Sequence, residues 1–109
     1  MDKNQNEYIL CAAIHYDDGE INIKRRCKNY PETGIVICGF RHSDIISILP
    51  TNNSMRNDGK EYKCTQGFIT SKGGFVDRIE AYKIAKREGQ LLVGADFEGK
   101  VQLFSEDIY

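Results

Sequence analysis

The chain has 109 residues and an almost balanced charge, with 15 lysines and arginines against 16 aspartates and glutamates and a net charge of −1. That length suits one domain, residues 1–109. The balance argues against a general nucleic-acid binder, because such proteins usually carry a marked basic excess. No apolar run is long enough to cross a bilayer or to serve as a signal peptide, so we expect no membrane partner and place the protein in the host cytoplasm.

The four cysteines stand at positions 11, 27, 38 and 64, too far apart for the short pairs typical of zinc sites. We therefore expect no metal site and no cofactor. Cys11 and Cys38 lie in apolar runs, and both are predicted to be small buried side chains of strands, the commonest fate of a free cysteine.

The first part of the chain is predicted to be mostly strand. Residues 1–7 are polar and are expected to be frayed. The apolar run 8–16 predicts a strand that ends at the turn 17–19, and the alternating segment 20–25 predicts a hairpin partner for it. The β-branched run 34–40 predicts a central strand buried on both faces.

A short helix is predicted next. Ser43 has the side chain of a helix cap, the helix is expected over 44–49, and Pro50 ends it because proline cannot continue a helix. The following residues, 51–59, are rich in Asn, Asp and Gly and predict a surface loop.

The best-defined element is a helix in the second half of the chain. Asp77 and Glu80 have the spacing of a capping box, and Gly89 stands where the helix end needs a left-handed residue. A strand over 62–71 and a turn at 72–74 are predicted before it.

Two further short strands are predicted at 90–93 and 100–104, joined by a glycine-containing loop. The sum of these elements is an α+β fold, with a mainly antiparallel sheet, one long helix and one short helix.

Two arginines are candidates for binding an anion. Arg41 follows the predicted central strand, so its backbone is fixed while its guanidinium can reach solvent, which suits bidentate recognition of phosphate. A salt bridge from Arg41 to Asp44, or to an acidic residue elsewhere in the chain, is an equally good interpretation. Arg78 and Asp77 stand at the start of the long helix, where backbone amides favour anions. The alternative role of Arg78 is to pair with Asp77, with Glu80 or with the carboxylates of the C-terminal tail.

Two aromatic residues are candidates for contact with a flat ring. Phe75 follows two glycines and is the better candidate for stacking on a nucleotide base. Phe68 is the second, although its place inside a predicted strand also favours a plain core side chain.

Both histidines fall where a predicted strand stops. His15 and His42 are each followed two residues later by an aspartate, Asp17 and Asp44. One hypothesis makes them the acid and base of a phosphodiesterase. In such enzymes the residue two positions after each histidine usually carries a hydroxyl group that holds the phosphate. The carboxylates of the two aspartates here would repel a phosphate instead. Polar strand ends without catalysis are the alternative.

Five blocks of the sequence resemble a group of small phage and prophage proteins: residues 11–19, 34–42, 66–71, 75–81 and 103–109. The group is similar to the first-described Thoeris anti-defence family, whose members are oligomeric sponges. They sequester cyclic ADP-ribose-type signals, and some also hold cyclic oligonucleotides, without cleaving them. The resemblance implies a homo-oligomer with a pocket shared between protomers, and contacts from Arg41, Phe75 and Arg78. Relatives often carry a second histidine after the one matching His42, where this chain has Ser43.

Three functional hypotheses therefore stand. The first is a phage anti-defence protein that binds and sequesters a cyclic nucleotide signal through Arg41, Phe75, Arg78, Asp77 and Phe68, without catalytic residues. The second is a nucleotide hydrolase that uses His15 and His42. The third is a phage interaction protein with no small ligand.

Overall fold

The computed structural model describes residues 6–21, 30–49 and 63–109 of the chain. The loop predicted at 51–59, most of the predicted frayed stretch 1–7 and most of the predicted hairpin partner 20–25 lie outside these residues.

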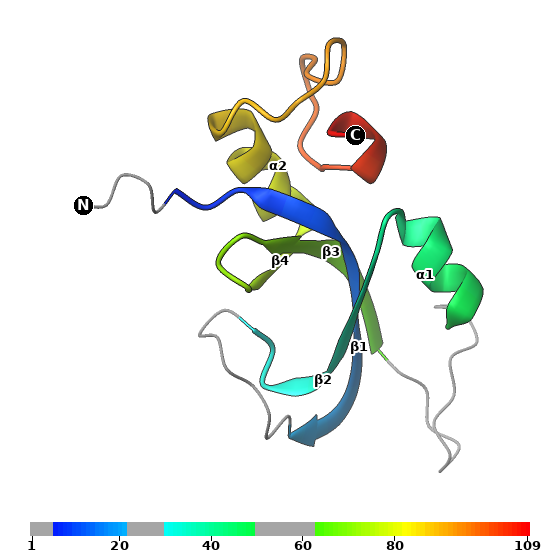
Figure 1. The fold of residues 1–109 in the computed structure, drawn as a ribbon. Helices are drawn as coiled ribbons and strands as arrows, with labels where there is room; N and C mark the ends of the chain where they lie inside the picture. Colours follow the sequence, from blue (N-terminus) through cyan, green and yellow to red (C-terminus); the bar gives the residue numbers. More distant parts are fainter. Residues whose placement is uncertain (1–5, 22–29, 50–62) are drawn as a thin grey trace.

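A four-stranded antiparallel sheet in the order β2-β1-β3-β4 is the centre of the molecule (Figure 1). The strands are β1 (Ile9–Ile21), β2 (Thr33–Gly39), β3 (Lys63–Thr70) and β4 (Phe75–Asp77); the helices are α1 (His42–Ile48), α2 (Arg78–Arg87) and the 3₁₀ turn η2 (Ser105–Asp107). The α+β fold class with one longer and one shorter α-helix is thus confirmed. None of the helices described here has the length and apolar character needed to span a membrane.

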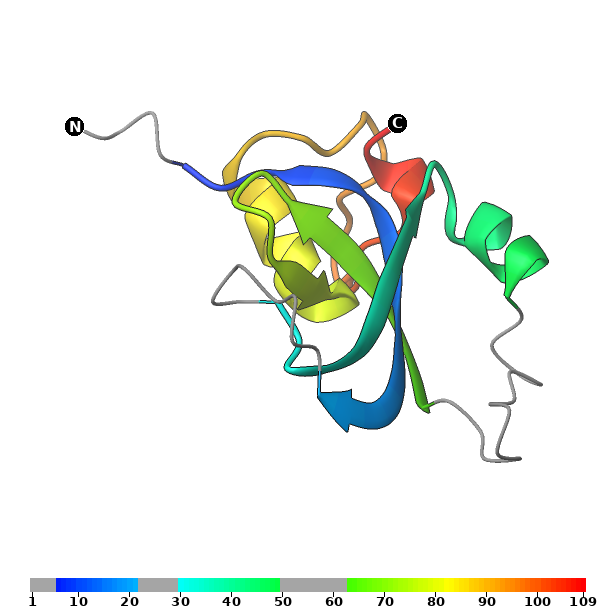
Figure 2. The same ribbon diagram turned by 60° about the horizontal axis from the view of Figure 1, so that its bottom comes forward.

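One face of the sheet carries the hydrophobic core. Alternate residues of β1, Ala12, Ile14 and Tyr16, are fully buried on this face. Ile45 of α1 and Ile84 of α2 pack into the same cluster of buried side chains, so both helices are held by one core. Figure 2 shows the positions of the two helices relative to the sheet.

Helix α2 has both of its predicted ends. Asp77 is the N-cap, and its Oδ1 accepts a hydrogen bond from the backbone N–H of Glu80 at 2.8 Å. Gly89 has a φ of +69° after the last turn, and the N–H of Gln90 donates to the Ala85 carbonyl at 2.8 Å. These bonds satisfy backbone groups that a helix end leaves open.

The first predicted hairpin is wrong. Strand β1 continues through residues 17–19, and its hairpin partner is β2. The register of the β1–β2 pair shifts between Tyr16 and Ile21, so the turn-forming residues are absorbed as an irregularity within a 13-residue strand.

Strand β2 is an edge strand, which corrects the prediction of a central strand buried on both faces. The central position belongs to β1. Cys38 of β2 is exposed and Cys11 of β1 is half-buried, so neither is the fully buried thiol that was expected.

Helix α1 begins two residues earlier than predicted, with Arg41 at the N-cap and Ser43 inside the first turn. The bond that was expected from Ser43 is replaced by the Asp44 carboxylate, whose Oδ2 accepts the N–H of Arg41 at 3.1 Å.

The strands predicted at 90–93 and 100–104 do not form. The backbone groups there bond to other parts of the chain: the N–H of Leu103 donates to the Arg78 carbonyl at 2.9 Å, and that of Leu92 to the Asp107 carbonyl at 2.8 Å. The apolar residues that suggested a strand at 100–104 include Leu103, which is buried in the core without belonging to a strand.

Candidate functional site

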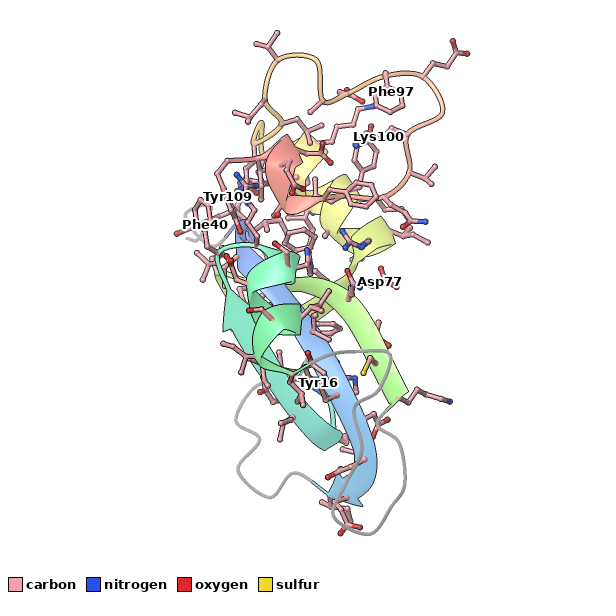
Figure 3. All side chains as sticks on the ribbon, turned by 90° about the vertical axis from the view of Figure 1, so that its right-hand side faces the viewer. Tyr16, Phe40, Asp77, Phe97, Lys100 and Tyr109 are labelled. Atoms are coloured by element: carbon pink, nitrogen blue, oxygen red, sulfur yellow. The ribbon has the colours of Figure 1, made fainter. Side chains whose placement is uncertain are left out.

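Residues 103–109, the C-terminal segment, lie between the two predicted arginines. Arg41 contacts its far end: Nη2 donates to the main-chain oxygen of Tyr109 at 2.6 Å, and Nη1 donates to the Ser105 hydroxyl at 3.3 Å. The guanidinium carbon also lies 4.8 Å from the ring centroid of Phe40 and 4.9 Å from that of Tyr109. Figure 3 shows these two rings beside each other. Arg41 is therefore engaged in holding the segment.

Arg78 contacts the near end of the same segment. Its Nη1 donates to the Leu103 carbonyl at 2.7 Å, and its Nη2 donates to the side-chain oxygen of Gln66 in β3. The guanidinium carbon lies 4.4 Å from the ring centroid of Phe104. Because these partners are neutral, they fix the guanidinium plane without cancelling its charge.

A groove of about 410 Å³ lies beside Arg78. We call it the Arg78 groove. Its walls come from the start of β3, the start of α2 and the C-terminal region, with these lining residues: Cys64, Thr65, Gln66, Asp77, Arg78, Ile79 and Gln102. Strand β4 pairs only with residues 67–69 of β3, so the first residues of β3 are not covered by β4 and border the groove.

The guanidinium of Arg78 has few direct hydrogen-bond partners. Burial lowers the pKa of its guanidinium, while the carboxylates of Glu106 and Asp107 act in the opposite direction. Only two of the five N–H donors of a guanidinium have acceptors among the residues that the structure describes. The arrangement can therefore offer further donors to an anion in the groove.

Asp77 and Phe75 do not both line the Arg78 groove. Asp77 lines the Arg78 groove, but its carboxylate already caps α2. Phe75 lines a second hollow of about 380 Å³, together with Glu7, Asp77 and Glu80. Its ring does not line the Arg78 groove, and the carboxylates around it oppose a phosphate.

The tight contact between β3 and β4 explains the position of Phe75. A Cβ atom on Gly67 would lie 2.0 Å from the Val76 carbonyl oxygen and 2.8 Å from the Phe75 ring. Glycine at this place lets the Phe75 ring lie over β3, where its centroid is 5.8 Å from that of His15.

Phe68 belongs to the core. Its side chain has 0% exposure, and its ring contacts that of His42 edge-on at 5.0 Å. A ligand at the surface of this structure therefore does not reach it.

The two histidines do not meet. His15 lies between the buried residues Ile14 and Tyr16 on β1, so it projects from the other face of the sheet, and its Nε2 bonds to the Thr33 carbonyl at 2.7 Å. His42 packs on the core side against Phe68. An acid–base pair across one phosphodiester is therefore not assembled by these two side chains in this structure.

His42 is buried and hydrogen-bonded, with its Nε2 at 2.7 Å from the Gly67 carbonyl oxygen. Burial lowers the pKa of its imidazole, and the nearby Arg78 guanidinium acts in the same direction. The Gly67 carbonyl and the Glu106 carboxylate act against it. The bond to Gly67 ties the His42 ring to strand β3.

The sequence did not point to Gln66, Gln102 or Phe104 as parts of a site. Gln66 fixes Arg78, Gln102 lines the groove, and Phe104 supports the guanidinium. A signal was present only for Gln66, which stands two residues before the buried Phe68 and therefore projects from the same face of β3.

The fold and the groove define a small α+β protein with an arginine fixed at the mouth of a polar groove. No cluster of three or more metal-ligating side chains is found among the described residues. The model of the phage T4 y16D protein family matches residues 8–109, and the chain belongs to that family. It is thus a phage protein. No curated protein and no solved structure matches it significantly.

Proposed function

We propose that this phage protein binds a cyclic nucleotide-type signal in the Arg78 groove and sequesters it without cleavage. The observation that carries the proposal is the fixed guanidinium of Arg78, held by two neutral acceptors at the wall of a groove of about 410 Å³. A guanidinium that is already oriented loses little freedom when it binds a phosphate, and its planar donors match phosphate oxygens.

The other lining side chains suit a nucleotide. Thr65, Gln66 and Gln102 supply neutral donors and acceptors for ribose hydroxyls or base edges. Neither histidine lines the groove, which favours binding over hydrolysis. The specific ligand class, a cyclic ADP-ribose isomer or a cyclic oligonucleotide, comes from the sequence resemblance to the Thoeris anti-defence family.

The proposal includes a homo-oligomer. A groove on one protomer leaves part of a nucleotide exposed, whereas tight ligand sites bury most of the ligand surface. A second protomer laid over the Arg78 groove would complete the enclosure. Light scattering of the purified protein, with and without nucleotide, measures the number of subunits.

Incubation with cyclic ADP-ribose isomers and with cyclic di- and trinucleotides tests the function. The protein is then heated to denature it, and the nucleotides are analysed by chromatography. We expect one nucleotide to be depleted from solution and to be recovered intact after heating. Cleaved product would support the hydrolase that uses His15 and His42, and no depletion would support an interaction protein without a small ligand.

The variant Arg78→Gln identifies the site. Loss of charged hydrogen bonds to an anion costs about 1.5–3 kcal/mol, so capture should weaken about 10- to 100-fold. The matched control is Arg87→Gln, because Arg87 is exposed in the last turn of the same helix, α2, and does not line the groove. Equal capture by both variants would contradict a site at Arg78.

A further inference from the structure

Two thiols lie together on the outer part of the sheet. Ala13 of β1 pairs with Cys38 of β2, and Cys11 stands two residues before Ala13, so both cysteines project from the same face of neighbouring strands. They line one apolar hollow of about 310 Å³, whose other walls include Leu10, Phe40 and Tyr109. Cys38 is exposed and Cys11 is half-buried, and neither is in a disulfide.

The two thiols interact directly. Although Cys38 as a whole residue is exposed, partial burial of its thiol raises the pKa of Cys38 to about 11, with further contributions from the charge of Cys11 and from the hydrogen bond between the two thiols. Both side chains are thus close, yet their positions on the strands are diagonal. Diagonal neighbours in an antiparallel pair have Cα atoms about 7–8 Å apart. A disulfide rarely spans more than about 7 Å, so an atom placed between the sulfurs fits this geometry better than a direct bond.

We propose that Cys11 and Cys38 form a two-thiolate site for a soft monovalent cation such as Cu⁺. Thiolate ligands select soft ions, and Cu⁺ is stable with two ligands. The site does not suit an ion that needs three or four ligands, because no cluster of His, Cys, Asp or Glu among the described residues has three members. Binding forms two Cu–S bonds and releases both thiol protons to water, which leaves a complex with a net charge of −1.

The surroundings favour that charge. The Arg41 guanidinium lies over the rings of Phe40 and Tyr109, and both rings line the hollow. A cation beside the wall of the hollow stabilises an anionic complex within it, and the apolar walls keep water and competing ligands away. The site is separate from the Arg78 groove, with which it shares no lining residue.

An anaerobic titration with Cu⁺, in competition with the chelator bathocuproine disulfonate, tests the proposal. The parent is the variant with Cys27→Ser and Cys64→Ser, in which Cys11 and Cys38 are the remaining thiols. We expect one ion per chain. A second thiolate on the same chain binds intramolecularly, so adding Cys38→Ser to the parent should weaken affinity about 100-fold or more.

Two further readouts separate a shared site from independent thiols. Bound Cu⁺ should protect both cysteines from alkylation, and affinity should rise with pH because two protons are released. Two ions per chain, or unchanged affinity after Cys38→Ser, would overturn the proposal. Cys38 is exposed, so this variant should keep the melting temperature of its parent, which excludes unfolding as the cause of any loss.

Discussion

Arg41 and Arg78 occupy equivalent places in the fold, yet they differ in what is left for a ligand. Each stands where a strand passes into a helix, each bonds to the C-terminal segment, and each guanidinium lies on an aromatic ring. Arg41 is held between two rings and two acceptors of the segment. Arg78 has neutral partners on one side and a groove on the other. The surroundings of a guanidinium, more than its position in the chain, decide whether it can serve a ligand.

The largest effect is expected from a change that loosens the C-terminal segment, to which both arginines bond. Leu103 is fully buried, and its backbone bonds to Arg78. Leu103→Ala should lower the free energy of unfolding by about 2–5 kcal/mol, because it leaves a cavity in the core. Denaturant unfolding measures this loss. The exposed neighbour Val101→Ala is the control and should change stability by less than about 0.5 kcal/mol. Similar values for the two would mean that the C-terminal segment is not anchored in the core.

Arg41→Ala should act on stability rather than on binding. It removes hydrogen bonds to Tyr109 and Ser105 and the contact with two rings, so we expect a loss of about 1.5–3 kcal/mol. Thermal melting measures the loss, with exposed Arg87→Ala as the control. An unchanged melting temperature would show that Arg41 does not hold the segment, which would make it available for a ligand after all.

His42, which lies near Arg78, should make the free energy of unfolding depend on pH. Its folded pKa is lowered below the ordinary value of 6.5, so the unfolded chain binds the proton more readily. This contribution to stability is complete above about pH 6.5 and is lost as the pH falls toward the folded pKa, with a slope of at most about 1.4 kcal/mol per pH unit. Unfolding free energies measured between pH 7.5 and pH 5 check the sign.

The variant His42→Gln should flatten that dependence. Equal slopes in the wild type and in His42→Gln would assign the titration to another group.

Asp77→Ala should have the smallest effect. The substitution removes the cap of α2 and should cost about 1 kcal/mol, measured by denaturant unfolding. It also removes a carboxylate from the Arg78 groove, so capture of an anionic nucleotide should be kept or strengthened. Weakened capture in a folded protein would indicate that Asp77 itself contacts the ligand. Exposed Glu98→Ala controls for the loss of one negative charge.

The elements with local signals could be predicted from the sequence. Asp77 and Gly89 mark the ends of α2 through bonds within a few residues, so the helix was found with both caps. Strand β3 and the turn after it were found for the same reason. The order of the strands depends on contacts between distant residues, and for that reason β2 was placed in the centre instead of at the edge.

The candidate site could be predicted only in part. Arg78 and Asp77 do line a groove, but Gln66 and Gln102 join them from segments far along the chain. The engagement of Arg41 by Tyr109 also spans most of the chain, and nothing near Arg41 in the sequence indicates it. Phe68 and Phe75 show the same limit, since strand pairing places one in the core and the other over Gly67.

Calorimetric titration of one captured cyclic nucleotide into three proteins tests the central claim most directly: the wild type, Arg78→Gln and Arg41→Gln, all below their melting temperatures. We predict that affinity falls about 10- to 100-fold in Arg78→Gln and stays within about twofold of the wild type in Arg41→Gln. The opposite pattern, with affinity lost in Arg41→Gln and retained in Arg78→Gln, would contradict the account.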